Sequence, residues 1–209
     1  MTAAVGSFRA APQAPLRERL VAAAIHLTST SGWTSVTMAR LAHLTGVSRQ
    51  TVYNEIGTKP ELAEAMVQAE LARFLAAMTG AFEEHPDDVV AALRAAVTGV
   101  LELAHDNPLI QAVASATHGA DTELLPLLTT RSADLLATAG AAVDGLLRPR
   151  RPRLADRRRA DVVDVVVRTV LSHVMQPTRT PAATAEAVAW IAGAALGPER
   201  PGRGGTRRS

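Results

Sequence analysis

Cysteine is absent from this 209-residue chain, which excludes disulfide bonds, thiolate metal sites and cysteine nucleophiles. Aromatic residues are only 3% of the sequence, so a hydrophobic core must be built mainly from alanine, leucine and valine. No apolar run reaches the roughly 18 residues that span a bilayer, and the Ala/Pro-rich start lacks the basic-then-apolar pattern of a secretory signal. These absences together predict a cytoplasmic protein with no membrane partner.

An all-α fold is expected from what remains. Alanine is a strong helix former, and β-branched runs are few outside residues 162–170. Caps, apolar spacing and Gly/Pro stops predict about nine helices, over residues 16–29, 37–45, 48–56, 58–84, 87–105, 108–117, 122–147, 156–175 and 181–196. Residues 1–15 and 198–209 are expected to form a disordered arm and a disordered tail.

The segment from Thr37 to Tyr53 has the pattern of two short helices joined by a glycine turn. Thr37 and Ser48 are suited to cap the two helices, and Gly46 is suited to the turn between them. Helical spacing then predicts a buried set of side chains: Met38, Leu41, Ala42, Thr45, Thr51 and Val52. The segment therefore predicts a helix-turn-helix.

The second helix of this pair would expose Arg49, Gln50, Tyr53 and Asn54. Such side chains stabilise a core poorly, but they suit a helix that lies in the major groove of DNA. Charge supports this interpretation, because residues 1–60 carry six basic and two acidic side chains, whereas residues 61–147 carry three and thirteen. The seven arginines within residues 148–159 are interpreted as a solvated loop between helices.

The N-terminal part of the chain resembles the DNA-binding domain of the TetR family of transcriptional regulators. The resemblance is carried by Gly32-Trp33, by the helix-turn-helix that ends in Tyr53, and by the Gly57-Thr58-Lys59 that follows it. The resemblance covers about residues 16–65. It implies a head, residues 16–58, that holds a three-helix DNA-binding domain, and a helical body, residues 59–197, that binds a ligand and dimerises. It also implies a homodimer that binds a palindromic operator in double-stranded DNA and releases it when a small molecule enters the body.

Carried over position by position, the resemblance implies eight DNA-binding residues: Thr37, Ser48, Arg49, Gln50, Thr51, Tyr53, Asn54 and Lys59. Gln50, Thr51 and Asn54 would lie nearest base edges, and Arg49 could contact either bases or phosphates. Thr37, Tyr53 and Lys59 would bind phosphates, with Lys59 assisted by the amino end of its helix. The plainer alternatives are that Tyr53 only anchors the core and that Lys59 is a solvated lysine.

Two arginines before the helix-turn-helix, Arg9 and Arg17, could reach a flanking phosphate or the minor groove. Glu55 is given no role, because a carboxylate that faced DNA would repel phosphate unless it accepted from a cytosine amino group.

The last two predicted helices differ from the others in their apolar surface. Residues 156–175 are apolar on nearly every side, and residues 181–196 are alanine-rich with Trp190 and Ile191 as larger side chains. Two such helices from each subunit can form a four-helix interface, although both could instead be core of one subunit. The expected interface residues are Val163, Val167, Val170, Val174, Ala187, Trp190, Ile191 and Ala194.

A ligand cavity is expected among the helices between residues 60 and 147, and the apolar side chains there favour a hydrophobic effector. The candidate residues are Phe74, Met78, Gln111, Thr117, His118 and Arg131. No cofactor and no metal ion are expected.

An enzyme is the first alternative to a regulator. The sequence shows no Ser/His/Asp order, no H-x-x-x-H pattern, no phosphate-binding glycine loop and no paired carboxylates on one helix face, so no catalytic residue is assigned. The second alternative is a helical small-molecule binding protein that does not bind specific DNA.

Overall fold

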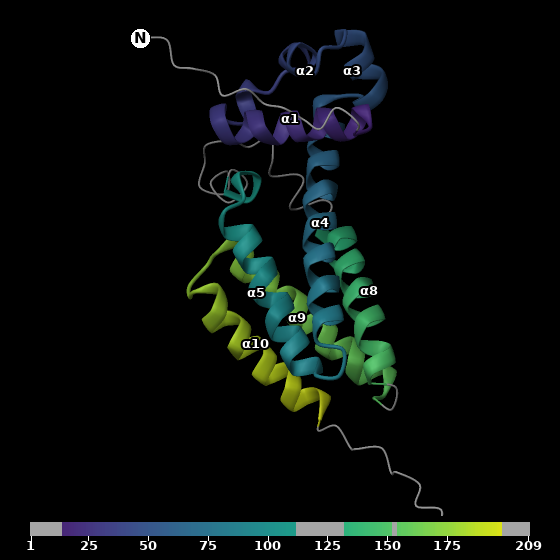
Figure 1. The fold of residues 1–209 in the computed structure, drawn as a ribbon, viewed down its shortest axis with the longest axis vertical. Coiled ribbons are helices and arrows are strands. Elements are labelled where there is room, and N and C mark those ends of the chain that lie inside the picture. Colours follow the sequence, from purple (N-terminus) through teal and green to yellow (C-terminus); the bar gives the residue numbers. More distant parts are fainter. Residues whose placement is uncertain (1–13, 112–131, 152–153, 198–209) are drawn as a thin grey trace, which may run out of the picture.

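The computed structural model of this chain describes residues 14–111, 132–151 and 154–197. Across these residues every regular element is helical, which confirms the predicted all-α fold (Figure 1). The elements are α1 (Leu16–Ser31), the 3-10 helix η1 (Trp33–Ser35), α2 (Met38–Thr45), α3 (Arg49–Ile56), α4 (Lys59–Glu84), α5 (Val89–His105), α8 (Ser132–Arg150), α9 (Asp156–Met175) and α10 (Pro181–Leu196). Within the described ranges, none of the helices has the length and apolar character needed to cross a membrane.

Parts of the prediction fall outside the described residues. They include the tail, the arm up to residue 13, most of the predicted helix 108–117 and the first part of the predicted helix 122–147. Residues 108–111 are described and are helical.

α5 begins later than its sequence pattern suggests. Its first residue is Val89, whereas the prediction placed the start at Asp87. The difference arises because Oδ1 of Asp88 accepts hydrogen bonds from the backbone N–H groups of Val90 and Ala91, so Asp88 is the residue that caps the helix.

α8 ends later than predicted. It continues past Leu147 to Arg150 and holds Pro149 inside its last turn. Pro149 has no backbone N–H to donate to the carbonyl of Gly145. In the same turn the side chain of Arg150 donates to the carbonyl of Leu146 at 3.0 Å. A basic side chain at a helix C-terminus also interacts favourably with the helix dipole, so the last turn is kept despite the proline.

The head is a three-helix unit that is closed by the first turns of α4. Figure 1 shows α1 lying across the end of α4, with α2 and α3 at the end of the molecule farthest from the body. The head core consists of buried side chains from α1 to α4, including Leu20, Leu27, Trp33, Val36, Leu41, Val52, Ile56, Leu62 and Met66.

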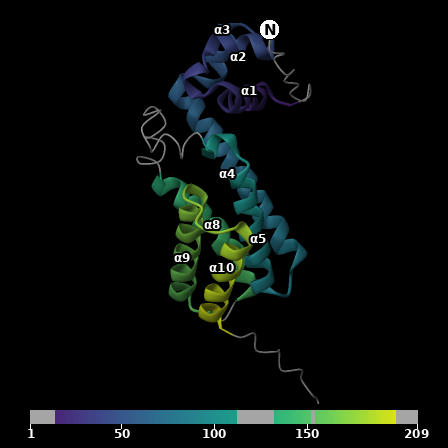
Figure 2. The same cartoon turned by 90° about the vertical axis from the view of Figure 1, so that its left-hand side faces the viewer.

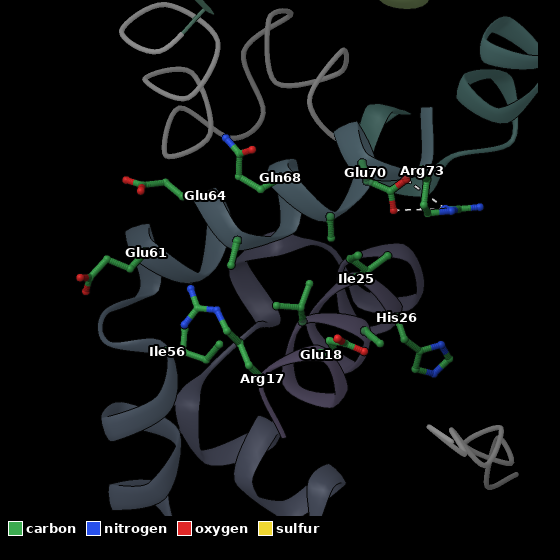
Figure 3. Close-up of a pocket in the computed structure, with 14 residues that line it drawn as sticks. Arg17, Glu18, Ile25, His26, Ile56, Glu61, Glu64, Gln68, Glu70 and Arg73 are labelled. Atoms are coloured by element: carbon green, nitrogen blue, oxygen red, sulfur yellow. Dashed lines mark hydrogen bonds and ion pairs between the residues drawn. The ribbon is translucent and has the colours of Figure 1, made fainter. Parts of the chain in front are cut away.

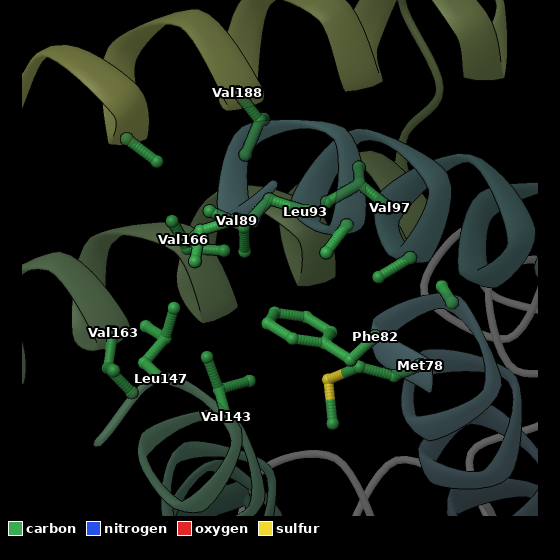
Figure 4. Close-up of a cluster of buried hydrophobic side chains, with 14 of the residues drawn as sticks. Met78, Phe82, Val89, Leu93, Val97, Val143, Leu147, Val163, Val166 and Val188 are labelled. Carbon is green, nitrogen blue, oxygen red and sulfur yellow. The ribbon is translucent and has the colours of Figure 1, made fainter. Parts of the chain in front are cut away.

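In the body, α5 and α8 pack against α4, α9 packs against α5 and α8, and α10 packs against α5 and α9. Figure 2 shows α9 and α10 side by side on one face of the body. Phe82 of α4 lies at the centre of its core, and valines and leucines of the other helices surround it (Figure 4). Phe82 is fully buried, so this one aromatic ring fills space that the aliphatic side chains leave.

α4 contributes to both hydrophobic cores. Leu62 near its start is buried in the head, and Met78 and Phe82 near its end are buried in the body. Two side chains from the body reach in the opposite direction, because Leu109 is buried in the head core and Met175 packs against it. Head and body are therefore joined by packing as well as by the chain.

α10 lies close against α5 because its contact face is made of small residues. A Cβ added to Gly193 would lie 2.9 Å from Cγ2 of Val90, which is closer than real Cβ contacts allow. Arg94 of α5 and Glu186 of α10 form an ion pair at the edge of this contact. Part of the alanine-rich face of α10 is thus used within the subunit.

The arginine-rich segment 148–159 is not a simple solvated loop, and this corrects the sequence interpretation. Arg159 is buried, and it donates to Asp144 and Asp156 at 2.6 Å each. Asp144 also accepts from Arg148 at 2.6 Å, so one carboxylate joins two arginines at the α8–α9 turn. The pKa of the Asp144 carboxyl lies below its usual range because Arg148 and Arg159 donate hydrogen bonds to it.

Because its pKa is lowered in the folded state, ionised Asp144 stabilises the fold above its unfolded pKa of 3.8. This contribution is lost as the pH falls below 3.8 and through the lower folded value. We expect Asp144→Asn to lower the melting temperature at pH 7 and to weaken its dependence on pH in that acidic range. Thermal unfolding followed by circular dichroism at a series of pH values measures both effects.

Asp164→Asn is the matched control, because Asp164 pairs with Arg168 on the surface of α9, where both side chains are exposed. It should change the melting temperature little. Equal destabilisation by the two variants would contradict the role given to Asp144.

Candidate functional site

The helix-turn-helix forms as the sequence predicts, and its two caps are visible. Oγ1 of Thr37 accepts from the backbone N–H of Arg40 at 3.2 Å, and Oγ of Ser48 accepts from the backbone N–H of Thr51 at 3.0 Å. Gly46 has φ 71° and ψ 31°, the left-handed conformation that glycine adopts without a steric penalty. The caps and the turn fix the angle between α2 and α3.

The exposed face of α3 carries Arg49, Gln50, Tyr53 and Asn54, as predicted. Tyr53 is 51% exposed, so its ring is not a core anchor. Nε2 of Gln50 donates to Oδ1 of Asn54 at 2.9 Å, which holds the two amides together one turn apart. The face therefore presents an ordered pair of amides between an arginine and a phenol.

The hydroxyls of the helix-turn-helix already make hydrogen bonds within the motif. Thr51 was predicted both to be buried and to lie near base edges, and it is half-buried, with Oγ1 at 2.8 Å from Oγ of Ser48. The oxygens of Thr37 and Ser48 are already used as helix caps. Thr37, Ser48 and Thr51 thus support the shape of the motif directly.

Arg17 is exposed, and its side chain also makes a contact within the head. Its Nη1 donates to the backbone carbonyl of Glu55 at 2.6 Å, in the last turn of α3. Arg19 makes the equivalent contact to the carbonyl of Thr45, the last residue of α2, at 2.9 Å. Two arginines of α1 therefore bind the negative ends of the two helix dipoles and hold the motif in place. Arg9 lies outside the described residues.

Lys59 is the first residue of α4 and lies beside the motif. Its ammonium nitrogen is 4.7 Å from the centre of the Trp33 ring. Part of the amino end of α4 is capped by the chain itself, because the backbone N–H and the hydroxyl of Thr58 both donate to Oε2 of Glu61. Both hydrogen bonds lower the pKa of the Glu61 carboxyl, and the bond from the backbone N–H has the larger effect.

The body encloses an apolar cavity of about 200 Å³ between α4, α5, α8, α9 and residues 109–110. Phe74 and Met78 line it, as predicted. Gln111 does not, since its side-chain amide donates to the carbonyl of His105 at 2.9 Å on the exposed surface. The other three candidates, Thr117, His118 and Arg131, lie outside the described residues.

Several residues that the sequence interpretation placed at the dimer interface also line this cavity. Val167, Val170 and Val174 are half-buried and line the cavity, and Val163 is buried in the core of its own subunit. One side of α9 therefore forms part of the cavity wall, which the sequence interpretation did not foresee.

The interface residues predicted on α10 remain accessible. Trp190 is 72% exposed and Ile191 is 53% exposed, while Ala187 is half-buried and Ala194 is exposed on the same helical face. Val165 of α9, which was not predicted, is also exposed. Large apolar side chains exposed in this way on neighbouring helices mark an interaction surface.

Glu70 is the one charged side chain among the described residues that line the cavity, and it is 3% exposed. Its carboxylate accepts from Nδ2 of Asn107 at 2.6 Å and from Nη1 of Arg73 at 2.9 Å. The carbonyl oxygen of the Asn107 side chain in turn accepts from the backbone N–H groups of Leu109 and Ile110. A hydrogen-bonded chain thus links α4 to two residues of the cavity wall.

A second hollow is an open groove of about 850 Å³ between α1 and α4 (Figure 3). Arg17, Glu18, Glu61 and Arg73 are among its lining side chains, and Figure 3 shows the contact between Arg73 and Glu70 at one end of it. The mixed charges and open form of this groove do not exclude water. The enclosed body cavity is the stronger candidate for an apolar ligand.

Comparison with known proteins identifies related chains. The family model described as "Bacterial Tetracyclin repressor, C-terminal domain" matches residues 88–194. The HTH-type transcriptional regulator AlkX of Mycobacterium tuberculosis (strain ATCC 25618 / H37Rv) is 25% identical over 170 residues, which is 81% of this chain and 80% of that protein.

Solved structures share the fold. The TetR family repressor AlkX from Dietzia sp. strain DQ12-45-1b, implicated in biodegradation of n-alkanes, superimposes with a TM-score of 0.71 at 24% identity, over 88% of this chain and 96% of that one. Thermus thermophilus FadR, a TetR family repressor in complex with lauroyl-CoA, gives a TM-score of 0.58 at 19% identity, over 90% and 99% of the two chains.

The cavity predicts that the body binds an uncharged hydrocarbon. An excess of 1-octanol should raise the melting temperature by about 5–11 °C if it reaches a hundred times its dissociation constant. Ala139→Phe places a ring in the cavity, because Ala139 lines it, and should abolish this rise. Differential scanning calorimetry with and without the alcohol measures the effect.

Ala137→Phe is the matched control on the same helix, where Ala137 is exposed and does not line the cavity. It should keep the full rise in melting temperature. A rise that survives in Ala139→Phe would show that the alcohol binds elsewhere.

Proposed function

Because this chain belongs to the TetR family of transcriptional regulators, as the match over residues 88–194 shows, we propose that it binds an inverted repeat in double-stranded DNA as a homodimer. We further propose that a small apolar molecule in the body cavity lowers this affinity, so that the protein is a ligand-responsive repressor. The observation that carries the proposal is the exposed polar face of α3 on a fully formed helix-turn-helix.

The side chains of α3 support direct reading of base edges. Asparagine and glutamine can make paired hydrogen bonds to adenine in the major groove, and arginine can make them to guanine. The hydrogen bond between Gln50 and Asn54 restricts both amides before DNA is bound, so less side-chain freedom is lost on binding. Arg49 and Tyr53 flank these amides and would contact a base or a phosphate.

A homodimer is supported by the apolar surface of α9 and α10. Trp190 and Ile191 would pack against the same helices of a second subunit, together with Ala187, Ala194 and Val165. A twofold axis through this surface would leave the two heads at the far end of the dimer. Two α3 helices about 34–36 Å apart would reach successive major grooves of DNA.

The ligand class follows from the cavity. A cavity of about 150 Å³ lined by apolar side chains can hold benzene, so one of about 200 Å³ can hold a somewhat larger hydrocarbon group. The name of the Dietzia relative refers to n-alkanes, and the Thermus relative was solved with lauroyl-CoA. Aliphatic chains are therefore the first ligands to test.

The coupling between ligand and DNA would pass through residues that the cavity and the head share. Leu109 and Met175 both line the cavity and pack with the head core. Glu70 and Asn107 tie Leu109 to α4 through buried hydrogen bonds. A ligand that pushed the segment at Leu109 aside would shift the head on α4, and so change the distance between the two α3 helices.

The DNA-binding proposal is tested by selecting bound sequences from random duplex DNA and titrating the best one with variants. We expect the selection to enrich an inverted repeat. The double variant Gln50→Ala/Asn54→Ala should bind this repeat at least about a hundredfold more weakly than the wild type, because two base-reading amides per subunit are lost. Nonspecific DNA should bind the two proteins alike.

Gln68→Ala is the control, because Gln68 is an exposed glutamine of α4 away from α3. It should leave operator affinity unchanged. If no inverted repeat is enriched while 1-octanol still binds the body, the protein is a helical binding protein without specific DNA binding.

The coupling proposal is tested with Asn107→Ala, which removes the hydrogen bond from Asn107 to Glu70. A molecule that weakens operator binding by the wild type should still raise the melting temperature of this variant. The factor by which it weakens operator binding should be at least about ten times smaller in the variant than in the wild type. Fluorescence anisotropy of labelled operator, with and without effector, measures the response.

Gln111→Ala removes a hydrogen bond from the same segment without touching Glu70, and it should keep the wild-type response. An Asn107→Ala protein that responds fully to the effector would exclude this route of coupling.

A further inference from the structure

Trp33 and Lys59 come from different parts of the head and lie next to each other. Trp33 begins η1, directly after Gly32, whose φ of 76° ends α1. Lys59 begins α4, and its ammonium nitrogen lies 4.7 Å from the centre of the Trp33 ring. A cation within about 6 Å of the face of an indole ring is attracted by the ring quadrupole.

Burial of the Trp33 indole carries an unfavourable free energy that its role in the hydrophobic core does not explain. The residue is 2% exposed, and within the described structure its indole Nε1 has no hydrogen-bond partner. A buried N–H without an acceptor is unfavourable, and a phenylalanine would fill much of the same space without one. What indole offers beyond phenylalanine is a stronger attraction for a cation over its face.

The surroundings of Lys59 also show why its position needs support. Lysine carries its charge on a flexible four-carbon chain, which leaves the ammonium poorly fixed unless something holds it. One backbone donor at the amino end of α4 is already used, because the carboxylate of Glu61 accepts from the backbone N–H of Thr58. The full positive charge that this end can offer a phosphate is the Lys59 ammonium.

We infer that Trp33 is a positioning residue, which holds the Lys59 ammonium over its ring so that it meets a DNA phosphate beside α3. The inference rests on the proposed DNA binding. Trp33 would raise operator affinity without touching DNA, by reducing the freedom that Lys59 loses when the phosphate binds.

A double-mutant cycle on operator binding tests the inference. Lys59→Met should weaken binding uniformly across sequences and reduce the salt dependence by about two counterions per dimer, since each subunit contributes one lysine. Trp33→Leu should weaken binding by about three- to tenfold and lower the salt dependence in the same direction. In the Lys59→Met background, Trp33→Leu should have little further effect.

Trp33→Phe is a second variant that keeps an aromatic ring in the core, so it tests the inference even if Trp33→Leu does not fold. Its affinity should fall between those of the wild type and Trp33→Leu, with an unchanged circular dichroism spectrum. If either Trp33 variant weakens the Lys59→Met protein as much as it weakens the wild type, Trp33 acts through the fold of the head and the inference is wrong.

A measurement on the free protein separates this inference from the proposed function. The chain has two tryptophans, so its NMR spectrum should contain two indole N–H signals, and Trp33→Phe identifies the one from Trp33. Lys59→Met should shift that signal, and Lys59→Arg should shift it less because a guanidinium also stacks on aromatic rings. A Trp33 signal that stays unmoved in Lys59→Met would overturn the inference even if the operator is bound.

Discussion

One continuous helix, α4, supplies side chains to two hydrophobic cores, and the arrangement of the molecule depends on this sharing. Leu62 completes the head and Phe82 completes the body, so neither core is whole without the same 26-residue element. Because packed cores resist deformation, a tilt of α4 cannot be absorbed at a flexible joint between head and body. In the proposed mechanism such a tilt would be transmitted to α3, which the arginines of α1 hold against the rest of the head.

The buried carboxylate of Glu70 lies where these two cores meet. A charge in that position is costly unless every bond to it is well made, and here Arg73 balances the charge while Asn107 supplies a short hydrogen bond. Such a group specifies one arrangement of the neighbouring backbone more sharply than apolar packing would. The segment at Leu109 is therefore held in a defined position, although its apolar contacts alone would tolerate small shifts.

The helix-turn-helix was predictable from sequence because its determinants are local. Thr37, Gly46 and Ser48 act on backbone groups within four residues, so their identity and spacing suffice. The roles of Arg17 and Arg159 were not predictable, since each binds acceptors brought near it by the fold: a carbonyl 38 residues away for Arg17, and for Arg159 the carboxylate of Asp144 on another helix. The valines of α9 show the same limit. Their pattern indicated two packed sides, but only the tertiary structure distinguishes a cavity wall from a subunit interface.

The insertion of Leu109 and Met175 into the head core has a consequence for synthesis of the protein. The ribosome releases the chain from its amino end, so the helix-turn-helix emerges before the residues that complete its packing. Met175 follows the end of the motif by well over a hundred residues, at roughly 5–20 residues per second. During that interval a nascent head would lack part of its apolar support. The full packing of the head is therefore reached only after Met175 has been made.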